Sequence, residues 1–149
     1  MNSANIFVLK DLTQEFFDLY WNTEKLGCPP IWSEIDTKFR KIPNYNKQGL
    51  YAFVKDIEVT YIGVGASKVS DKYPNHGLSS RFQKYCKWID EANDIYGAKD
   101  QRLIDAGAVI TIGFEPEHAH LSYALEMFLI SRIKPFHNVI GKNSIKNYV

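Results

Sequence analysis

The chain has little cysteine, no long hydrophobic run and almost no net charge. Its 149 residues include two cysteines, Cys28 and Cys86, which lie far apart and form no CxxC motif. A metal cluster is therefore not expected, and reduced thiols in a cytoplasmic protein are the simplest interpretation. No apolar run approaches the roughly 20 residues that span a bilayer, and the N-terminus lacks the basic and apolar regions of a secretory signal. We therefore expect a cytoplasmic protein without membrane contact.

The near-neutral charge argues against a surface that is basic throughout. Eighteen Lys and Arg balance seventeen Asp and Glu, which leaves a net charge of +1. Proteins coated with positive charge to hold nucleic acid differ from this. The length fits one domain, and the 45% of hydrophobic residues is typical of a folded globular protein. Aromatic residues are plentiful, with nine Tyr and nine Phe.

The charges are unevenly distributed along the chain. Residues 68–87 hold five Lys or Arg and one acid, and residues 131–149 hold four Lys or Arg and no acid. All other residues together carry nine basic and sixteen acidic side chains. Because a local basic face does not require a basic total, the two segments predict a narrow, salt-sensitive contact with phosphates. Two solvated charge runs are the alternative interpretation.

The pattern of apolar residues predicts an α/β (α+β) fold. Helices are expected over residues 6–26, 78–93 and 116–133, and strands over residues 50–54, 57–64 and 108–114. The first two strands are separated by a short polar link, which predicts a β-hairpin. We therefore expect a small, mainly antiparallel three-stranded sheet flanked by helices. Residues 1–48 would form a helical extension that packs on a domain formed by residues 49–149.

The length of the hairpin loop decides which faces carry Tyr51 and Tyr61, because side chains alternate along a strand. A three-residue loop over residues 55–57 would place the two tyrosines opposite each other on one face. A loop of two or four residues would place them on opposite faces. The sequence leaves this choice open.

Several polar residues interrupt the apolar packing pattern. Glu126 stands in the middle of an apolar helix, where its carboxylate faces either solvent or a partner. The tripeptides Gly49-Leu50-Tyr51 and Tyr61-Ile62-Gly63 occupy the two hairpin strands. Residues 78–85 (LSSRFQKY) carry an arginine and a tyrosine four positions apart, and residues 134–138 (KPFHN) place an asparagine twelve positions after Glu126.

In this order, these segments resemble the GIY-YIG nuclease family over about residues 49–141. The Glu-bearing helix is most similar to that of the GIY-YIG domain in the bacterial excision-repair incision subunit. The resemblance implies a metal-dependent endonuclease that hydrolyses phosphodiester bonds in double-stranded DNA, for restriction, for phage or mobile-element cleavage, or for repair. It also implies a set of catalytic residues: Tyr51, Tyr61, Arg81, Tyr85, Glu126 and Asn138.

The chemistry of these side chains suits phosphodiester hydrolysis. Glu126 is the only carboxylate in the matched motifs, which fits a single Mg²⁺ (or Mn²⁺) ion that prefers oxygen ligands and keeps several waters. Arg81 presents a planar, permanently charged fork that matches a phosphate.

The resemblance also implies roles for the tyrosines and the asparagine. In the family, a tyrosine of the first tripeptide is usually proposed as the general base, which here is Tyr51. An unperturbed tyrosine has a pKa near 10, so this role needs help from neighbouring positive charge. Tyr61 would assist by hydrogen bonding, Tyr85 would position the phosphate, and Asn138 would brace the site by hydrogen bonds to the backbone.

Further residues are expected at the substrate. Gly63 would permit close backbone approach, although a turn requirement explains it equally well. Many relatives carry a lysine three positions after the second tyrosine, where this chain has Val64, and Lys68 is the candidate replacement. Lys84 adds positive charge beside the expected site. His76 lies in an inserted loop beside the same site, with a loop histidine of no catalytic part as the alternative.

Two other functions remain open at this point. The chain could be a catalytically weak or inactive module that binds nucleic acid with a nuclease fold. It could also be an interaction protein in which residues 1–48 dock a partner through Phe16, Phe17, Trp21 and Trp32, unless these rings pack on the core of the protein itself. The presence of every matched polar position favours the enzyme.

Overall fold

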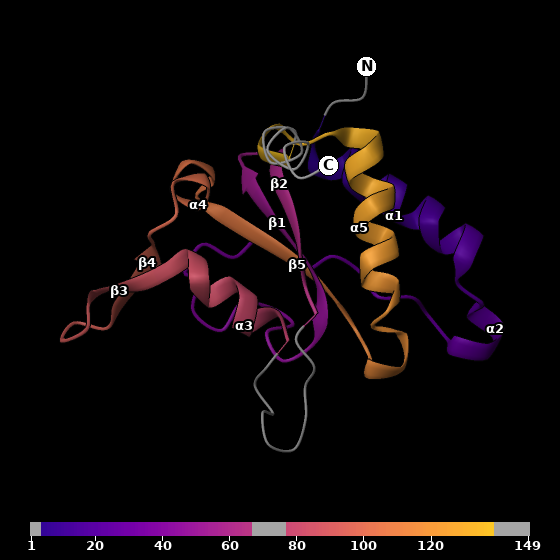
Figure 1. Cartoon of the computed structure of the whole chain (residues 1–149), viewed down its shortest axis with the longest axis horizontal. Coiled ribbons are helices and arrows are strands. Elements are labelled where there is room, and N and C mark those ends of the chain that lie inside the picture. The colour runs from indigo at the N-terminus through magenta and orange to yellow at the C-terminus, as the bar shows by residue number, and fades with distance from the viewer. Residues whose placement is uncertain (1–3, 67–76, 139–149) are drawn as a thin grey trace, which may run out of the picture.

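The fold is taken from a computed structural model, which describes residues 4–66 and 77–138 (Figure 1). Its elements in chain order are α1 (Ile6–Tyr20), α2 (Thr23–Leu26), β1 (Gln48–Lys55), β2 (Glu58–Gly65), α3 (Leu78–Phe82), the 3₁₀ turn η1 (Gln83–Tyr85), β3 (Cys86–Asp90), β4 (Ile95–Ala98), α4 (Gln101–Ala106), β5 (Ala108–Phe114), the 3₁₀ turn η2 (Pro116–His118) and α5 (Leu121–Ile133). The mixed α/β architecture predicted from the sequence is confirmed. None of the helices in these ranges is long and apolar enough to cross a membrane.

The central sheet has three antiparallel strands in the order β2-β1-β5. Six consecutive residues of β1, from position 49 to 54, are buried, and so is every residue of β5. Strands that are covered on both faces are hydrophobic at every position rather than at alternate ones. The run AVITIGF in β5 has this character and forms the edge strand next to β1.

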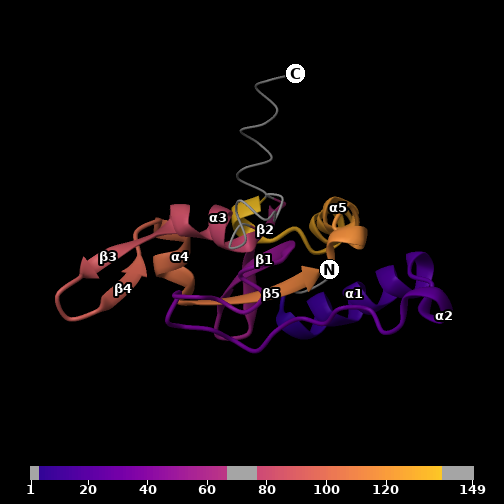
Figure 2. The same cartoon turned by 90° about the horizontal axis from the view of Figure 1, so that it is seen from below.

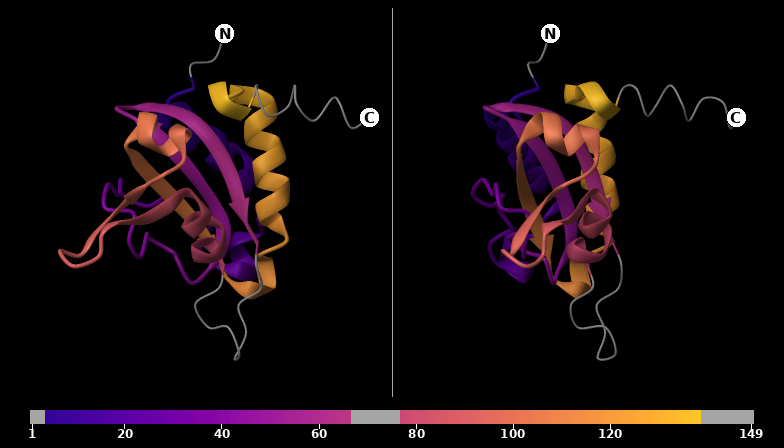
Figure 3. Two further views of the ribbon diagram at one scale, coloured as in Figure 1. Left: turned by 60° about the vertical axis from the view of Figure 1, so that its left-hand side comes forward. Right: turned by 90° about the vertical axis from the view of Figure 1, so that its left-hand side faces the viewer.

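Helices cover both faces of the sheet, as the turned views show (Figure 3). Leu50, Ala52 and Val54 of β1 pack into one apolar cluster with residues of α1 and α5. Tyr51 and Phe53, which alternate with them, pack into a second cluster with α3, η1 and α4. Because side chains alternate along β1, this one strand contributes to both cores.

The N-terminal helices lie at one end of the molecule, opposite the β3–β4 hairpin (Figure 2). Three of the four aromatic residues considered for partner docking are buried in the apolar cluster: Phe16, Phe17 and Trp32. The indole Nε1 of Trp32 donates a hydrogen bond to Oγ1 of Thr13 over 2.8 Å. These rings therefore pack on the core of the protein itself.

The free edge of β5 is covered by the chain that leads from α2 to β1. The backbone N–H of Ser33 donates to the carbonyl of Thr111 over 2.7 Å, and Asp36 and Val109 exchange two backbone hydrogen bonds of 2.9 Å. An uncovered edge would expose unpaired backbone groups to other chains. The irregular residues between α2 and β1 thus complete the sheet.

The helix predicted over residues 78–93 is wrong beyond Tyr85. After α3 and η1 the chain forms the β3–β4 hairpin, whose tip spans residues 91–94. At this tip the Asp90 carboxylate accepts hydrogen bonds from the backbone N–H and the side-chain Nδ2 of Asn93, and Asp94 has a φ of 58°. Short polar side chains of this kind favour turns and the left-handed region, which a continuing helix does not allow.

Two further differences concern short helices. The helix predicted over residues 6–26 is interrupted before Asn22, whose side chain accepts the N-terminal hydrogen bond of α2 from the N–H of Lys25. Helix α4 was not expected, although Asp100 caps its N-terminus and Gly107 ends it with a φ of 83°. An acidic N-cap residue and a glycine past the last turn are ordinary helix boundary signals.

The hairpin between β1 and β2 has a two-residue turn, yet Tyr51 and Tyr61 share one face. Near the turn, Thr60 is an extra residue, so that the register shifts next to Phe53. Tyr61 then lies opposite Phe53, and Tyr51 lies opposite Gly63. With a regular two-residue turn, Tyr61 would lie on the face opposite Tyr51. The β-bulge shifts the pairing by one residue and brings both tyrosines to the same face.

Candidate active site

Three tyrosines from three elements meet on the α3 side of the sheet. The ring centroids of Tyr51 and Tyr61 are 6.2 Å apart, those of Tyr51 and Tyr85 are 5.6 Å apart, and those of Tyr61 and Tyr85 are 6.5 Å apart. The hydroxyls of Tyr51 and Tyr85 form a hydrogen bond of 2.8 Å. Three of the residues that the motifs singled out are therefore in one cluster.

Gly63 makes room for the ring of Tyr51. A Cβ atom at position 63 would lie 2.3 Å from both Cζ and Oη of Tyr51, which is fully buried. At Gly65, two positions along β2, a Cβ atom would lie 2.9 Å from the Cα of Leu78 at the start of α3. The two glycines therefore let a tyrosine and a helix approach the strand closely, which gives Gly63 a structural role in the site.

Arg81 joins the cluster from α3. A hydrogen bond with Tyr51 is the main reason that the pKa of this guanidinium is raised. The same bond lowers the pKa of Tyr51, but burial and the neighbouring hydroxyls of Tyr85 and Tyr61 have the larger effect and raise that pKa well above its ordinary value of 10. Tyr51 is therefore a poor proton acceptor in the protein as it stands.

Tyr61 ionises more readily than Tyr51. Burial and the contact with Tyr85 raise the pKa of Tyr61 to about 12, while the positive charges of Arg102 and Arg81 partly oppose the rise. Tyr61 is also only partly buried, whereas Tyr51 is inaccessible to solvent. Of the two motif tyrosines, only Tyr61 thus has surface that solvent can reach.

Glu126 approaches the cluster from the other side of β2. Its helix α5 and the helix α3 both contact β2, and the positive charge of Arg81 acts on the Glu126 carboxylate. Burial has the larger effect and raises the pKa of Glu126. A half-buried carboxylate within the field of an arginine has the chemistry to bind a cation.

The described residues offer no protein cage for a metal ion, and Glu126 is the carboxylate that the motifs supply. Among residues 4–66 and 77–138, no group of three or more His, Cys, Asp or Glu side chains could form a protein cage for a metal. One carboxylate with water molecules and a substrate phosphate is an ordinary environment for Mg²⁺. Glu126 would be the protein ligand of such an ion.

Asn138 holds the outer edge of β2. Its Oδ1 accepts a hydrogen bond of 2.7 Å from the N–H of Ile62, and its Nδ2 donates one of 2.8 Å to the carbonyl of the same residue. The amide thus satisfies both outward backbone groups of the residue between Tyr61 and Gly63. These contacts are with the backbone, the kind of bracing that the resemblance implies for Asn138.

Of the remaining predicted substrate residues, Lys84 alone lies within the described ranges. Lys84 is exposed on η1, next to Tyr85. Lys68 and His76 lie outside the described residues. Val64 is half-buried on β2 and pairs with Leu50, so it belongs to the face opposite the tyrosines.

Sequence reasoning missed Arg102, which covers the tyrosine cluster from α4. Its guanidinium carbon lies 4.7 Å from the ring centroid of Tyr61 and 5.3 Å from that of Tyr85. The Asp100 carboxylate accepts two hydrogen bonds of 3.0 Å from this guanidinium and raises its pKa. The helix boundary signals at Asp100 and Gly107 would have located α4, but nothing in the sequence indicates which rings Arg102 covers.

Comparison with protein-family models, curated proteins and solved structures gives no match for this chain. What indicates a function is therefore the geometry of the tyrosines, Arg81 and Glu126, and the motifs that these residues form.

Proposed function

We propose that the protein is a metal-dependent DNA endonuclease of the GIY-YIG type that hydrolyses phosphodiester bonds. The observation that supports this best is the convergence of Tyr51, Tyr61, Tyr85, Arg81 and Glu126 from β1, β2, η1, α3 and α5. These residues are distant in sequence, and they bring a cation and ionisable hydroxyls together, with the Glu126 carboxylate within the field of the same cation.

Each group has a task in phosphodiester hydrolysis. A divalent cation bound at Glu126 would supply charge that stabilises the phosphoryl and leaving oxygens. Arg81 is exposed and permanently charged, so its guanidinium can hold the non-bridging oxygens of the phosphate. Arg81 also interacts with the buried Tyr51, which raises the pKa of the guanidinium.

The tyrosines would orient the attacking water and accept its proton. The resemblance assigns the base role to Tyr51, but the burial of Tyr51 and its raised pKa make Tyr61 Oη the better acceptor. Tyr61 must first lose its own proton to become the base, and the positive charge of Arg102, stacked on its ring, would favour that phenolate before it takes the proton of the attacking water. In this arrangement the hydrogen bond between Tyr51 and Tyr85 holds the ring cluster in place.

The same burial supports a second candidate function. A site whose central hydroxyl is fully buried and whose only motif carboxylate is half-buried could bind DNA without cutting it. Such a module would still need Arg81 for phosphate contact, but it would have no need of Glu126.

The decisive experiment incubates supercoiled plasmid with the protein and Mg²⁺ or Mn²⁺, with and without EDTA. Glu126→Gln keeps the size of the side chain and removes its charge, and we expect it to reduce the cleavage rate by at least about a hundredfold while DNA binding persists. Glu117→Gln on η2 is the matched control, because Glu117 is exposed and outside the cluster. Cleavage by Glu126→Gln at the unaltered rate would refute the proposal, and binding without any cleavage by the unaltered protein would favour the second function.

A further inference from the structure

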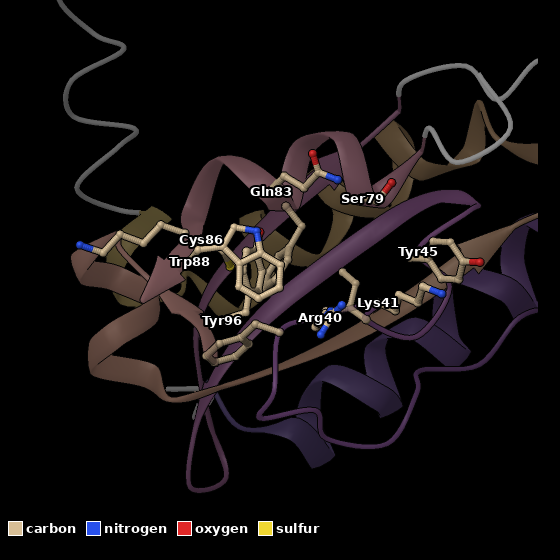
Figure 4. A pocket seen from close by; sticks show the side chains of 12 residues that line it. Arg40, Lys41, Tyr45, Ser79, Gln83, Cys86, Trp88 and Tyr96 are labelled. Carbon is tan, nitrogen blue, oxygen red and sulfur yellow. The ribbon is translucent and has the colours of Figure 1, made fainter. Parts of the chain in front are cut away.

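A hollow of about 550 Å³ lies beside α3 and η1 (Figure 4). Helix α3 and η1 form one wall through Phe82 and Gln83, and the β3–β4 hairpin contributes Trp88 and Tyr96. The opposite wall is the chain at residues 39–45. A neighbouring hollow of about 540 Å³ shares Arg40, Lys41 and Tyr96 with it, so the two form one groove along this wall. We call it the α3–hairpin groove.

The wall at residues 39–45 is held in a fixed shape. Phe39, Lys41 and Asn44 have left-handed φ angles of 64°, 48° and 61°, which side chains other than glycine rarely adopt. Burial of Phe39 and the hydrogen bond of 3.1 Å from Asn44 Nδ2 to Thr111 Oγ1 keep this conformation. Strained backbone persists only where the surrounding structure determines it, and such positions are common at binding sites.

The lining of the groove is basic. Arg40, Lys41 and Lys87 line the larger hollow, which has no acidic lining residue among those described. In the neighbouring hollow, Lys38 adds a fourth cation and Asp94 forms an ion pair with Arg40. Both partners of that pair are exposed, and exposed ion pairs contribute little free energy to stability. Arg40 can therefore exchange Asp94 for another anion.

An aromatic surface stands beside these cations. Trp88 is 41% exposed although it is one of the largest apolar side chains, and its ring centroid lies 5.2 Å from that of Tyr96. The guanidinium of Arg40 lies 5.0 Å from the centroid of the Trp88 ring. Figure 4 shows the indole standing over the groove between the side chains of η1 and those of the opposite loop.

From this combination we propose that the α3–hairpin groove binds a single-stranded segment of DNA next to the cleavage site. Lys41, Lys87 and Arg40 would neutralise successive phosphates, and Trp88 would stack on an unpaired base. The inference rests on the proposed nuclease function, because Phe82 lines the groove while its ring centroid lies 6.2 Å from that of Tyr51. A strand held in the groove would thus run along the helix that carries Arg81.

The chemistry of the groove favours a single strand over a duplex. Cations that follow a backbone and an exposed aromatic face are the features of proteins that bind single-stranded nucleic acid. In a duplex the base faces are stacked on one another, so an exposed indole would gain little from it. The hollow is also within the size range of pockets that enclose ligands of nucleotide size.

The test measures binding without catalysis. We titrate a fluorescent thymidine oligonucleotide with the whole chain in EDTA and follow binding by fluorescence anisotropy. The oligonucleotide has about 12 nucleotides, which is within the range that one single-stranded site covers. Trp88→Ala is expected to weaken binding about tenfold, the effect of one lost stacking contact. The double variant Lys41→Glu/Lys87→Glu is expected to weaken it by at least about tenfold at low salt.

Matched controls separate the groove from general effects of charge and surface. Lys10→Glu/Lys25→Glu changes the net charge equally at exposed positions on α1 and α2, and Phe7→Ala removes an exposed aromatic ring from α1. Both should bind the oligonucleotide as the unaltered protein does. Trp88→Phe keeps a stacking ring, so binding should persist while the quenching of tryptophan fluorescence by the oligonucleotide disappears.

The results distinguish this inference from the proposed function. The groove proposal is overturned if Trp88→Ala and the double lysine variant both bind the oligonucleotide normally. It is also overturned if the unaltered protein does not bind the oligonucleotide, even if that protein cuts plasmid. The same titration is done with a duplex of equal length. If the groove variants lose binding to the duplex but keep binding to the single strand, the single-strand assignment is overturned. Weakened binding of the oligonucleotide in a protein that cuts no plasmid upholds the groove and refutes the nuclease.

Discussion

The two faces of the central sheet are built from different chemistry. On the α1–α5 face, the buried residues of β1 are Leu50, Ala52 and Val54, which pack on aliphatic and phenylalanine side chains. On the α3–α4 face, Tyr51 and Phe53 pack beside Tyr85, and the hydroxyls there form hydrogen bonds inside the protein.

The difference shows how one strand can serve stability and chemistry together. An apolar face contributes through burial alone, and its residues can be exchanged for others of similar volume. A face with buried hydroxyls must satisfy each polar group, so its geometry is more narrowly defined. We therefore expect substitutions on the first face to change the free energy of unfolding and those on the second to change the activity.

The largest expected effect on stability is on the apolar face. Leu50→Ala should lower the free energy of unfolding by about 2–5 kcal/mol, because it leaves a cavity in a fully buried site. The neighbouring residue Tyr51 lies on the opposite face. Tyr51→Phe removes only a hydroxyl and should lower the free energy of unfolding by roughly 1 kcal/mol. Urea denaturation of both variants measures the difference, and equal losses would contradict the division between the faces.

A smaller loss is expected where the tyrosine face has no spare room. Gly63→Ala should lower the free energy of unfolding by about 1–3 kcal/mol, because the new methyl group must displace the buried ring of Tyr51. Cleavage should fall as the hydrogen bond between Tyr51 and Tyr85 is broken. Gly97→Ala is the matched control in β4, where the methyl group meets only the end of the exposed side chain of Ile89. Full activity of Gly63→Ala would show that the position of the ring does not matter.

The last expected effect, a loss of stability that appears only in alkali, arises from the tyrosine face. The pKa values of Tyr61 and Cys86 are raised to about 12, from ordinary values of 10 and 9. The unfolded chain therefore releases these protons at lower pH than the folded protein, and the stability they contribute is present below about pH 9 and declines towards pH 12.

Urea midpoints across this pH range measure the decline. Tyr61→Phe should make it shallower, and Tyr123→Phe, at an exposed position on α5, should leave it unchanged. A decline that is identical in Tyr61→Phe and the unaltered protein would show that Tyr61 does not contribute to it.

The sequence predicts the main sheet and the long helices because their signals are local. The β-branched run of β5 and the mostly apolar 13-residue sequence of α5 each define an element by themselves. The β3–β4 hairpin was missed because the apolar residues of 82–89 also fit a helical repeat, and only the turn at Asp90–Asp94 excludes it. The bulge at Thr60 cannot be predicted, since it depends on pairing with β1 and on packing beneath the sheet.

In the candidate site, too, local motifs could be predicted from the sequence, whereas contacts between distant segments could not. The motifs located Tyr51, Tyr61, Arg81 and Glu126, but the burial that raises the pKa of Tyr51 depends on tertiary packing. The positions of Arg102 over two rings and of Trp88 beside Arg40 are likewise contacts between distant segments. Residue types in a pattern can suggest chemistry, whereas the ease of ionisation and the shape of a groove need the fold.

Asn138 is separated from Ile62, the residue it holds, by 76 positions of chain. During translation the β1–β2 hairpin therefore leaves the ribosome well before the amide that closes its outer edge. In that interval the edge of β2 is open to pairing with a neighbouring nascent chain. The edge at Ile62 is thus covered only after most of the chain has been made.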